Sequence, residues 1–187
     1  MRSGVFFAIF IVVVLRPSAR ADEPRVISPD RHFAVVTTAS GAGEQEVSSY
    51  AIRARSTGRT LATCPRDSRF ASTPDKVSWS PDSRFVAILT RTSRHGGVPD
   101  LWRVSASSAS LIKVDLDKED DADIYVTPKR WLNALELQCD VFGRSDSEHR
   151  RLHPKEPWVE YTLVLRLDPS SPKARVLRSP PKYPAQS

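Results

Sequence analysis

Two histidines, His149 and His153, have the spacing in this sequence that comes nearest to a metal or catalytic site. On a helix, side chains four residues apart lie on one face, where two imidazoles can hold zinc or another transition metal. The stretch around them, 145–155, has no apolar periodicity, and Pro154 resists the continuation of a helix. We therefore expect a solvated insertion loop. The alternative is a metal-dependent or hydrolytic enzyme that uses this loop.

Acidic side chains gather between residues 115 and 123, and carboxylate oxygens are ligands that calcium prefers. An EF-hand loop beginning at Asp115 needs glycine at its sixth position and glutamate at its twelfth, but Asp120 and Val126 stand there. A solvated loop is the expectation. The alternative is a calcium site on four aspartates of the stretch, Asp115, Asp117, Asp121 and Asp123. No other cofactor is predicted.

The sequence contains no G-x-S-x-G motif and no C-x-x-C motif, so neither a serine hydrolase nor a thioredoxin-like redox site is indicated. The two cysteines, Cys64 and Cys139, are far apart along the chain. In an oxidising compartment an even number of cysteines favours one long-range disulfide. Two separate buried thiols are the alternative, and both remain open. A non-enzymatic protein is favoured over an enzyme.

Aromatic residues and loops supply the candidates for ligand binding. Tryptophan is enriched at binding hot spots, and loops on a rigid scaffold commonly carry function. Trp131 and Trp158 flank a polar insertion, and His95 lies in a loop with two glycines. We assign a candidate binding role to these three residues and expect Trp79 and Trp102 in the core.

The first 21 residues have the features of a secretory signal in the expected order. Arg2 is followed by an apolar run from Val5 to Leu15, and Ala19-Arg20-Ala21 forms a small-x-small cleavage site. The run is shorter than the about 20 residues that a membrane-spanning helix needs, and no later stretch approaches that length. We expect cleavage before Asp22, with an uncleaved anchor as the alternative.

Export places the protein in the periplasm or outside the cell, without a membrane span once the signal is removed. The chain has 28 basic and 22 acidic residues, and those that remain after cleavage are interspersed. This scattering argues against a nucleic-acid partner. We expect another exported protein or an envelope component as the partner.

Two stretches of the chain repeat at an offset of 52 positions. Ser28-Pro29-Asp30 precedes an apolar run that begins at Phe33, and Ser80-Pro81-Asp82 precedes one that begins at Phe85. At the same offset, Tyr50-Ala51-Ile52-Arg53 falls opposite Trp102-Arg103-Val104-Ser105. The sequence therefore predicts a repeated unit.

A third, weaker copy is expected to begin at Thr127-Pro128. Its residues 132–135 align with Phe85–Ile88 at an offset of 47, and residues 161–167 supply its partner strand. These last residues alternate between apolar and polar, which is typical of a β-strand with one buried face. Ser-Pro-Asp suits a type I turn, and 15 prolines disfavour long helices.

The residues from Val77 to Ala87 (VSWSPDSRFVA) resemble the WSPDG signature of TolB-type β-propeller repeats, and Leu101-Trp102-Arg103-Val104 stands where that family has its next strand. The first copy has Ile27 in place of the signature's tryptophan. Arg31 and Ser83 replace the usual glycine, so we expect a turn that does not need a positive φ. The resemblance implies a propeller-like scaffold of the kind that often serves protein interaction.

Propellers typically close with four to eight blades, and this chain has material for about three. We expect an all-β fold, a partial or small propeller-like array of about three antiparallel β units over residues 22–177, followed by a Pro-rich flexible tail at 178–187. A sandwich of the same units and a homodimer that completes a ring are alternatives. The predicted function is an exported, non-enzymatic binding or assembly module.

Overall fold

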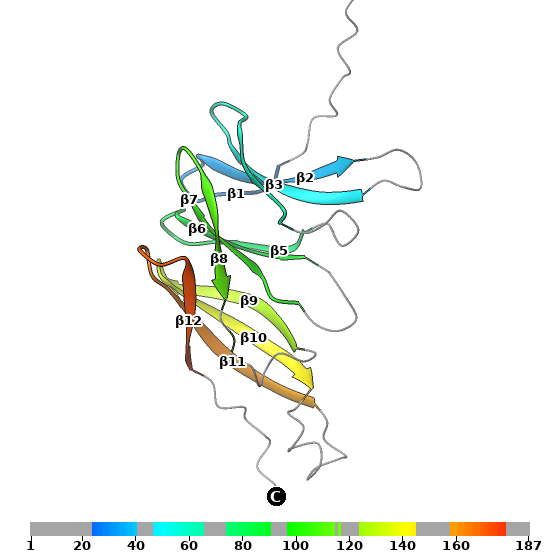
Figure 1. Ribbon diagram of the computed structural model, residues 1–187, viewed down its shortest axis with the longest axis vertical. Coiled ribbons are helices and arrows are strands. Elements are labelled where there is room, and N and C mark those ends of the chain that lie inside the picture. Colours follow the sequence, from blue (N-terminus) through cyan, green and yellow to red (C-terminus); the bar gives the residue numbers. More distant parts are fainter. Residues whose placement is uncertain are drawn as a thin grey trace, which may run out of the picture.

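The structure is a computed structural model that describes residues 24–40, 47–65, 74–90, 97–114, 116, 124–144 and 158–178. These residues form β-strands and turns, without a helix in the described ranges (Figure 1). The strands are β1 (Pro24–Ile27), β2 (Phe33–Ser40), β3 (Val47–Ala54), β4 (Thr60–Thr63), β5 (Pro74–Trp79), β6 (Phe85–Thr90), β7 (Asp100–Val104), β8 (Ala109–Val114), β9 (Ile124–Asn133), β10 (Glu136–Arg144), β11 (Trp158–Leu167) and β12 (Lys173–Arg178). Arg178, the first residue of the expected tail, thus ends β12; the rest of the tail and the expected signal lie outside the described residues.

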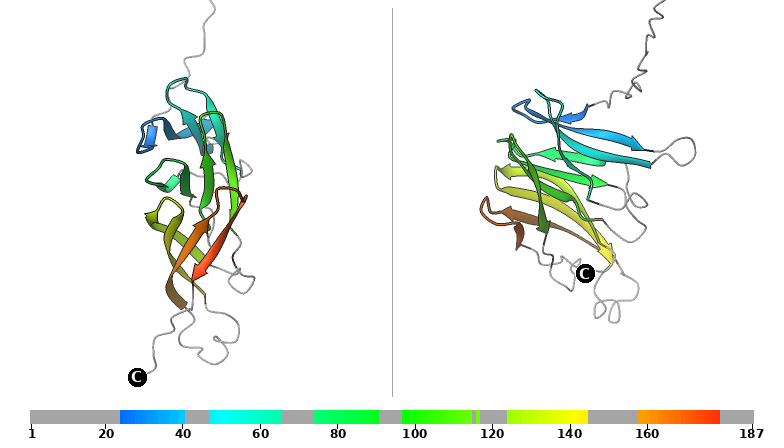
Figure 2. Two further views of the ribbon diagram at one scale, coloured as in Figure 1. Left: turned by 90° about the vertical axis from the view of Figure 1, so that its left-hand side faces the viewer. Right: turned by 45° about the horizontal axis from the view of Figure 1, so that its top comes forward.

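The strands form three consecutive four-stranded antiparallel units, which we call blades. The first blade, β1–β4, is a sheet of its own, whereas the second, β5–β8, and the third, β9–β12, join into one eight-stranded sheet. Lys173 and Ala174 of β12 pair in parallel with Lys113 and Val114 of β8 at the join. The blades follow one another along the long axis of the molecule (Figures 1 and 2). The expected all-β, propeller-like array of three units is confirmed.

Each Ser-Pro-Asp motif closes the first hairpin of its blade with the same hydrogen bonds. Ser28 Oγ lies 2.6 Å from Asp30 Oδ1, to which it donates, and Phe33 N donates to Ser28 Oγ at 3.0 Å. In the second blade Ser80 Oγ donates to Asp82 Oδ1 at 2.6 Å, and Phe85 N donates to Ser80 Oγ at 3.0 Å. The serine and aspartate therefore act as a side-chain clamp on the turn.

The expectation about φ in these turns was wrong. Arg31 has a φ of 63° and Ser83 a φ of 61°, the left-handed region that glycine enters most easily. In both turns the backbone N–H of this residue donates to the carbonyl of the motif serine, Arg31 N to Ser28 O and Ser83 N to Ser80 O, each at 2.9 Å. These bonds and the clamp together hold the turn in its conformation. The positive φ of Arg31 and Ser83 costs about 1 to 2 kcal/mol for a residue with a side chain, and the hydrogen bonds of the turn offset this cost.

Two hydrophobic clusters lie between the blades. The cluster between the first and second blades includes Phe33, Val35, Val86, Ile88 and Trp102. The cluster between the second and third blades is built from the opposite face of the second blade together with the third. Its buried members are Phe85, Ala87, Leu101, Ile112, Val126, Leu137, Cys139, Val141, Tyr161, Leu163, Leu165, Leu167 and Ala174. The alternation of the strands thus lets the second blade fill both interfaces.

A pair of stacked rings repeats at the two interfaces. The rings of Phe33 and Trp79 stack with centroids 6.2 Å apart, and those of Phe85 and Trp131 do so at 6.4 Å. Each phenylalanine opens the second strand of its blade, and each tryptophan belongs to the first strand of the next. Because both members of the second pair lie 52 positions after those of the first, Trp131 is the third-blade equivalent of Trp79.

This equivalence corrects the expected third copy. Thr127 and Pro128 lie within β9 and do not form a turn; the β9–β10 turn is at residues 134 and 135. Trp131 pairs with Leu137 as Trp79 pairs with Val86, so the second strands of these blades are related by an offset of 51 and not 47. Four residues lie between Trp131 and Glu136, one fewer than the five between Trp79 and Phe85, and as a result the odd-numbered residues of β10 face the second blade.

The third strands of the first two blades are also offset differently from the expectation. Phe33 pairs with Ala54, whereas Phe85 pairs with Arg103. Trp102 is therefore equivalent to Arg53 and not to Tyr50. The difference of three positions arises in the connection between the second and third strands, because a change in the length of that connection does not alter the pairing of the strands.

Candidate functional site

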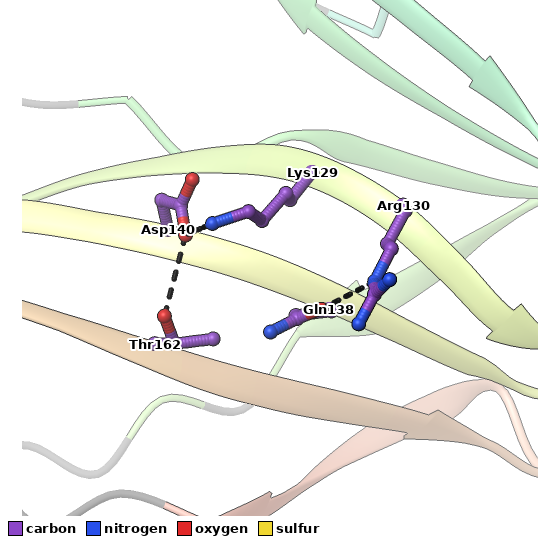
Figure 3. A network of polar contacts seen from close by, with 5 residues as sticks. All are labelled: Lys129, Arg130, Gln138, Asp140 and Thr162. Atoms are coloured by element: carbon purple, nitrogen blue, oxygen red, sulfur yellow. Dashed lines mark hydrogen bonds and ion pairs between the residues drawn. The ribbon is translucent and has the colours of Figure 1, made fainter.

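The outer face of the third blade, which points away from the second, is covered by paired polar side chains from β9, β10 and β11 (Figure 3). Lys129 Nζ and Asp140 Oδ1 form an ion pair at 3.0 Å, with about half of each side chain exposed. Thr162 Oγ1 donates to the same carboxylate oxygen at 3.3 Å, and Arg130 Nε donates to Gln138 Oε1 at 2.8 Å. These five residues, Lys129, Arg130, Gln138, Asp140 and Thr162, are called the outer-face network.

Glu136, on the same outer face as the outer-face network, occupies a position that is apolar in the first two blades. The register of the hairpins places Glu136 where Phe33 and Phe85 stand. Those phenylalanines stack on the following blade, whereas Glu136 Oε2 accepts a hydrogen bond from Asn133 Nδ2 at 2.9 Å. Repeat arrays need a polar outer face on their terminal unit. The third blade therefore has the character of a terminal cap.

Apolar groups are nevertheless exposed on this blade. Among the described residues, five large hydrophobic side chains are exposed, namely Ile27, Leu111, Leu132, Phe142 and Leu177. Three of them belong to the third blade, and Phe142 alternates with Cys139 and Val141 so that it shares the face of Asp140. Arginine and aromatic residues together are typical of the centre of protein interfaces. The third blade has this combination of surface groups.

The hairpin turns that the structure describes, which join the first two and the last two strands of each blade, lie along one edge of the molecule, toward the left in Figure 1. Here side chains hold neighbouring blades together. Asp30 N donates to Ser83 Oγ at 3.0 Å, and Arg59 Nη2 donates to Ser107 O at 2.5 Å, which link the first blade to the second. Arg103 Nη2 lies 2.9 Å from Asp168 O and 2.5 Å from Ser171 O, which links the second blade to the third.

Two carboxylates of this edge, Asp30 and Asp168, are stabilised in their ionised form. Slight burial raises the pKa of Asp30, but the hydrogen bonds from Ser28, His32 N and Ser83 outweigh it, so that the pKa lies below its usual value. The pKa of Asp168 is lowered chiefly by the hydroxyl and backbone N–H of Ser170, at 2.6 and 2.8 Å. Both side chains organise turns through these hydrogen bonds.

A buried polar chain connects the first and second blades inside their interface. Trp102 Nε1 donates to the Tyr50 hydroxyl at 2.9 Å, and that hydroxyl donates to Asp100 Oδ2 at 2.8 Å. Tyr50 is fully buried, and burial together with the nearby carboxylate raises its pKa far above the usual range. A phenol that stays protonated is a hydrogen-bond donor, so this chain is a structural link between blades.

The structure places only some of the residues that the sequence singled out. Trp131 is half-buried, stacks on Phe85 and donates from Nε1 to Ser78 O at 3.2 Å, so packing engages its ring and its N–H. Trp79 and Trp102 are buried in the core, as expected. Trp158 begins β11, but its side chain is outside the described residues. So are His95, His149, His153 and the four aspartates of the calcium hypothesis, Asp115, Asp117, Asp121 and Asp123.

Cys64 and Cys139 are free thiols, and the disulfide between them is not formed in this structure. Cys139 is buried in the cluster between the second and third blades, while Cys64 packs at the edge of the cluster between the first and second. Burial raises the pKa of Cys139 to about 12, which keeps it an unreactive thiol. Within the described part of the chain, no group of three His, Cys, Asp or Glu side chains is arranged to hold a metal.

The outer-face network is the functional candidate that the sequence analysis missed. The 52-residue spacing of Trp79 and Trp131 was the available signal for the third blade, but that spacing puts Leu137 at the phenylalanine position, and only the shorter turn of the structure puts Glu136 there. Among the described residues, no helix is long and apolar enough to cross a membrane.

Comparison with known proteins gives a limited result. No protein-family model matches the chain, and no curated relative matches its sequence. Among solved structures, hydrazine synthase from Kuenenia stuttgartiensis is similar, with a TM-score of 0.39 and 12% sequence identity over 80% of this chain. The chain spans 39% of the length of that protein.

Proposed function

We propose that this chain is an exported, non-enzymatic binding or assembly module, built on TolB-type β-propeller repeats, that docks another protein on the outer face of its third blade. The observation that carries the proposal is the combination on that blade of an exposed Phe142 with the ion pair and the hydrogen bonds of the outer-face network. The TolB-type assignment is supported by the two Ser-Pro-Asp turns, whose hydrogen bonds are the same in both blades.

A protein surface fits this face better than a small ligand does. The outer face is one face of a β-sheet. Lys129, Asp140 and Thr162 lie side by side on three neighbouring strands of this face, so one protein surface can contact all three. The ion pair is solvated, so it adds little to stability in the free protein. When a partner covers it, water is excluded and the pair can fix the register of docking. Phe142, which is 47% exposed, supplies the apolar area that such a contact needs.

Site-specific photocrosslinking in the native host tests the docking surface. A crosslinking residue at Phe142 should form one discrete adduct, and the matched control is Leu111, which is 43% exposed on the second blade. After the adduct is identified, Phe142→Ala should weaken binding of the purified partner about tenfold, as expected for an interface anchor. Equal adducts at both positions, or unchanged affinity, would contradict this surface as the binding site.

The export part of the proposal has its own measurement. Protein recovered from the envelope or the medium should have Asp22 as its first residue, which intact-mass spectrometry resolves from the full chain. Recovery of the protein solely from the cytoplasm with its first residues intact would refute export while leaving the docking surface to be judged by the crosslink.

A further inference from the structure

Four exposed arginines gather on the turn edge of the first two blades. Arg31 lies in the turn between β1 and β2, and Arg55 and Arg59 lie between β3 and β4. Arg84 lies in the turn between β5 and β6 of the second blade. We call these four residues the arginine edge. They come from three different hairpin ends, so the fold and not the sequence brings them together.

Contacts between the turns make the arginine edge one continuous surface. Arg55 Nη1 donates to the carbonyl of Arg31 at 3.0 Å. The turn of Arg31 reaches the turn of Arg84 through the bond from Asp30 N to Ser83 Oγ at 3.0 Å. Arg59 extends along the same edge to Ser107 O in the second blade. Arg55 and Arg59 are each anchored by one guanidinium nitrogen, which orients the group at the surface.

The charge of the arginine edge is only partly offset. Asp30 and Asp82 lie on it, and each carboxylate accepts from a serine hydroxyl and from a backbone N–H of its own turn. In the third blade, acidic Glu136 directly follows the β9–β10 turn, and acidic Asp168 lies between β11 and β12. The arginines of the described hairpin turns are thus confined to the first two blades. Ile27, which is 43% exposed, directly precedes the first turn and adds an apolar group beside the cations.

We propose that the arginine edge binds the surface of an anionic phospholipid membrane. A row of turns from two blades presents its cations along an edge and matches an extended negative surface, where each basic side chain adds to attraction independently of a specific pocket. Exposed Ile27 is placed to enter the interfacial region beside the phosphates. This inference does not depend on the proposed function, because it uses a different surface and a different class of partner.

The test is sedimentation of the purified chain with vesicles of phosphatidylcholine, with and without phosphatidylglycerol. Binding should require phosphatidylglycerol and decline as salt is raised above about 0.1 M, where the screening length is about 10 Å. The double variant Arg55→Gln/Arg84→Gln should partition about 25-fold more weakly, at about fivefold for each arginine removed. The variant Arg55→Lys/Arg84→Lys should keep most of the binding, because it keeps the charge.

The matched control removes two cations from another surface. Arg166 and Arg175 are exposed, pair with each other across β11 and β12, and lie on the third blade. Arg166→Gln/Arg175→Gln should bind the vesicles within twofold of the unaltered chain. Equal losses in the two glutamine variants would mean that net charge alone acts and would overturn the proposal. So would lack of vesicle binding by the folded chain, or tight binding of soluble polyglutamate with the same arginine dependence, which would indicate an acidic protein partner.

Discussion

Replacing Tyr50 with phenylalanine should separate the contribution of the buried hydroxyl from that of the aromatic ring. The hydroxyl donates to Asp100 at 2.8 Å and accepts from Trp102 at 2.9 Å, and the side chain is fully buried. A hydrogen bond to a charged group is worth about 1.5 to 3 kcal/mol, and a buried donor left unpaired costs about 1 to 3 kcal/mol. We expect Tyr50→Phe to lower the free energy of unfolding by about 2 to 4 kcal/mol.

Equilibrium unfolding in urea measures this effect. With a slope of about 2 kcal/mol per molar, the midpoint should fall by about 1 to 2 M at an unchanged slope. The control is Thr162→Ala, which removes an exposed hydroxyl with a long 3.3 Å contact and should change stability by less than about 0.5 kcal/mol. A loss in Tyr50→Phe as small as that of the control would refute the view that the chain from Trp102 to Asp100 joins the two blades.

Three further predictions concern the thiols, the pH dependence and the assembly state. Cys64 is half-buried and should react with a thiol reagent much faster than buried Cys139, so native protein should show one fast thiol and denatured protein two. Because burial raises the pKa of Cys139 to about 12, the unfolded chain releases the thiol proton near pH 9 while the folded chain keeps it. The free energy of unfolding should therefore be unaffected by this thiol below pH 9 and should fall above it by about 1.4 kcal/mol per pH unit. Urea unfolding at a series of pH values measures this slope, which Cys139→Ala should reduce. Because polar residues cap the third blade, light scattering should give the mass of a monomer; a stable dimer would instead support completion of a ring by two chains.

The sequence was sufficient for the fold class because turn chemistry and strand alternation are local signals. Ser-Pro-Asp followed by an apolar run marked two hairpins correctly, and the stacking partners of the tryptophans lie at the repeat spacing. The third hairpin was misaligned because its turn keeps neither Ser nor Asp, and Pro128 drew the alignment into the middle of a strand. The length of the turn before β10 decides which face of this strand is buried. A turn that is one residue shorter leaves the number of apolar residues unchanged, so the apolar content of the sequence does not reveal it.

The surface candidates could not be read from the sequence for a different reason. The outer-face network joins residues on three strands, and the arginine edge joins three turns, so both depend on register and on the packing of one blade against the next. Scattered basic residues looked uninformative because their spacing along the chain has no period. Their grouping arises when hairpin ends are brought to one edge.

The way the blades are joined has a consequence for how the molecule opens. The second and third blades share main-chain bonds, from Lys113 N to Pro172 O at 2.8 Å and from Val126 N to Gly97 O at 2.8 Å. In the described residues the first blade is held by side-chain contacts, such as Asp30 N to Ser83 Oγ. Detachment of the first blade therefore leaves the eight-stranded sheet of the other two blades intact. The backbone amides of the first blade should exchange with solvent at a lower opening free energy than those of these eight strands. Such a chain would open under mechanical force first at the boundary between the first and second blades.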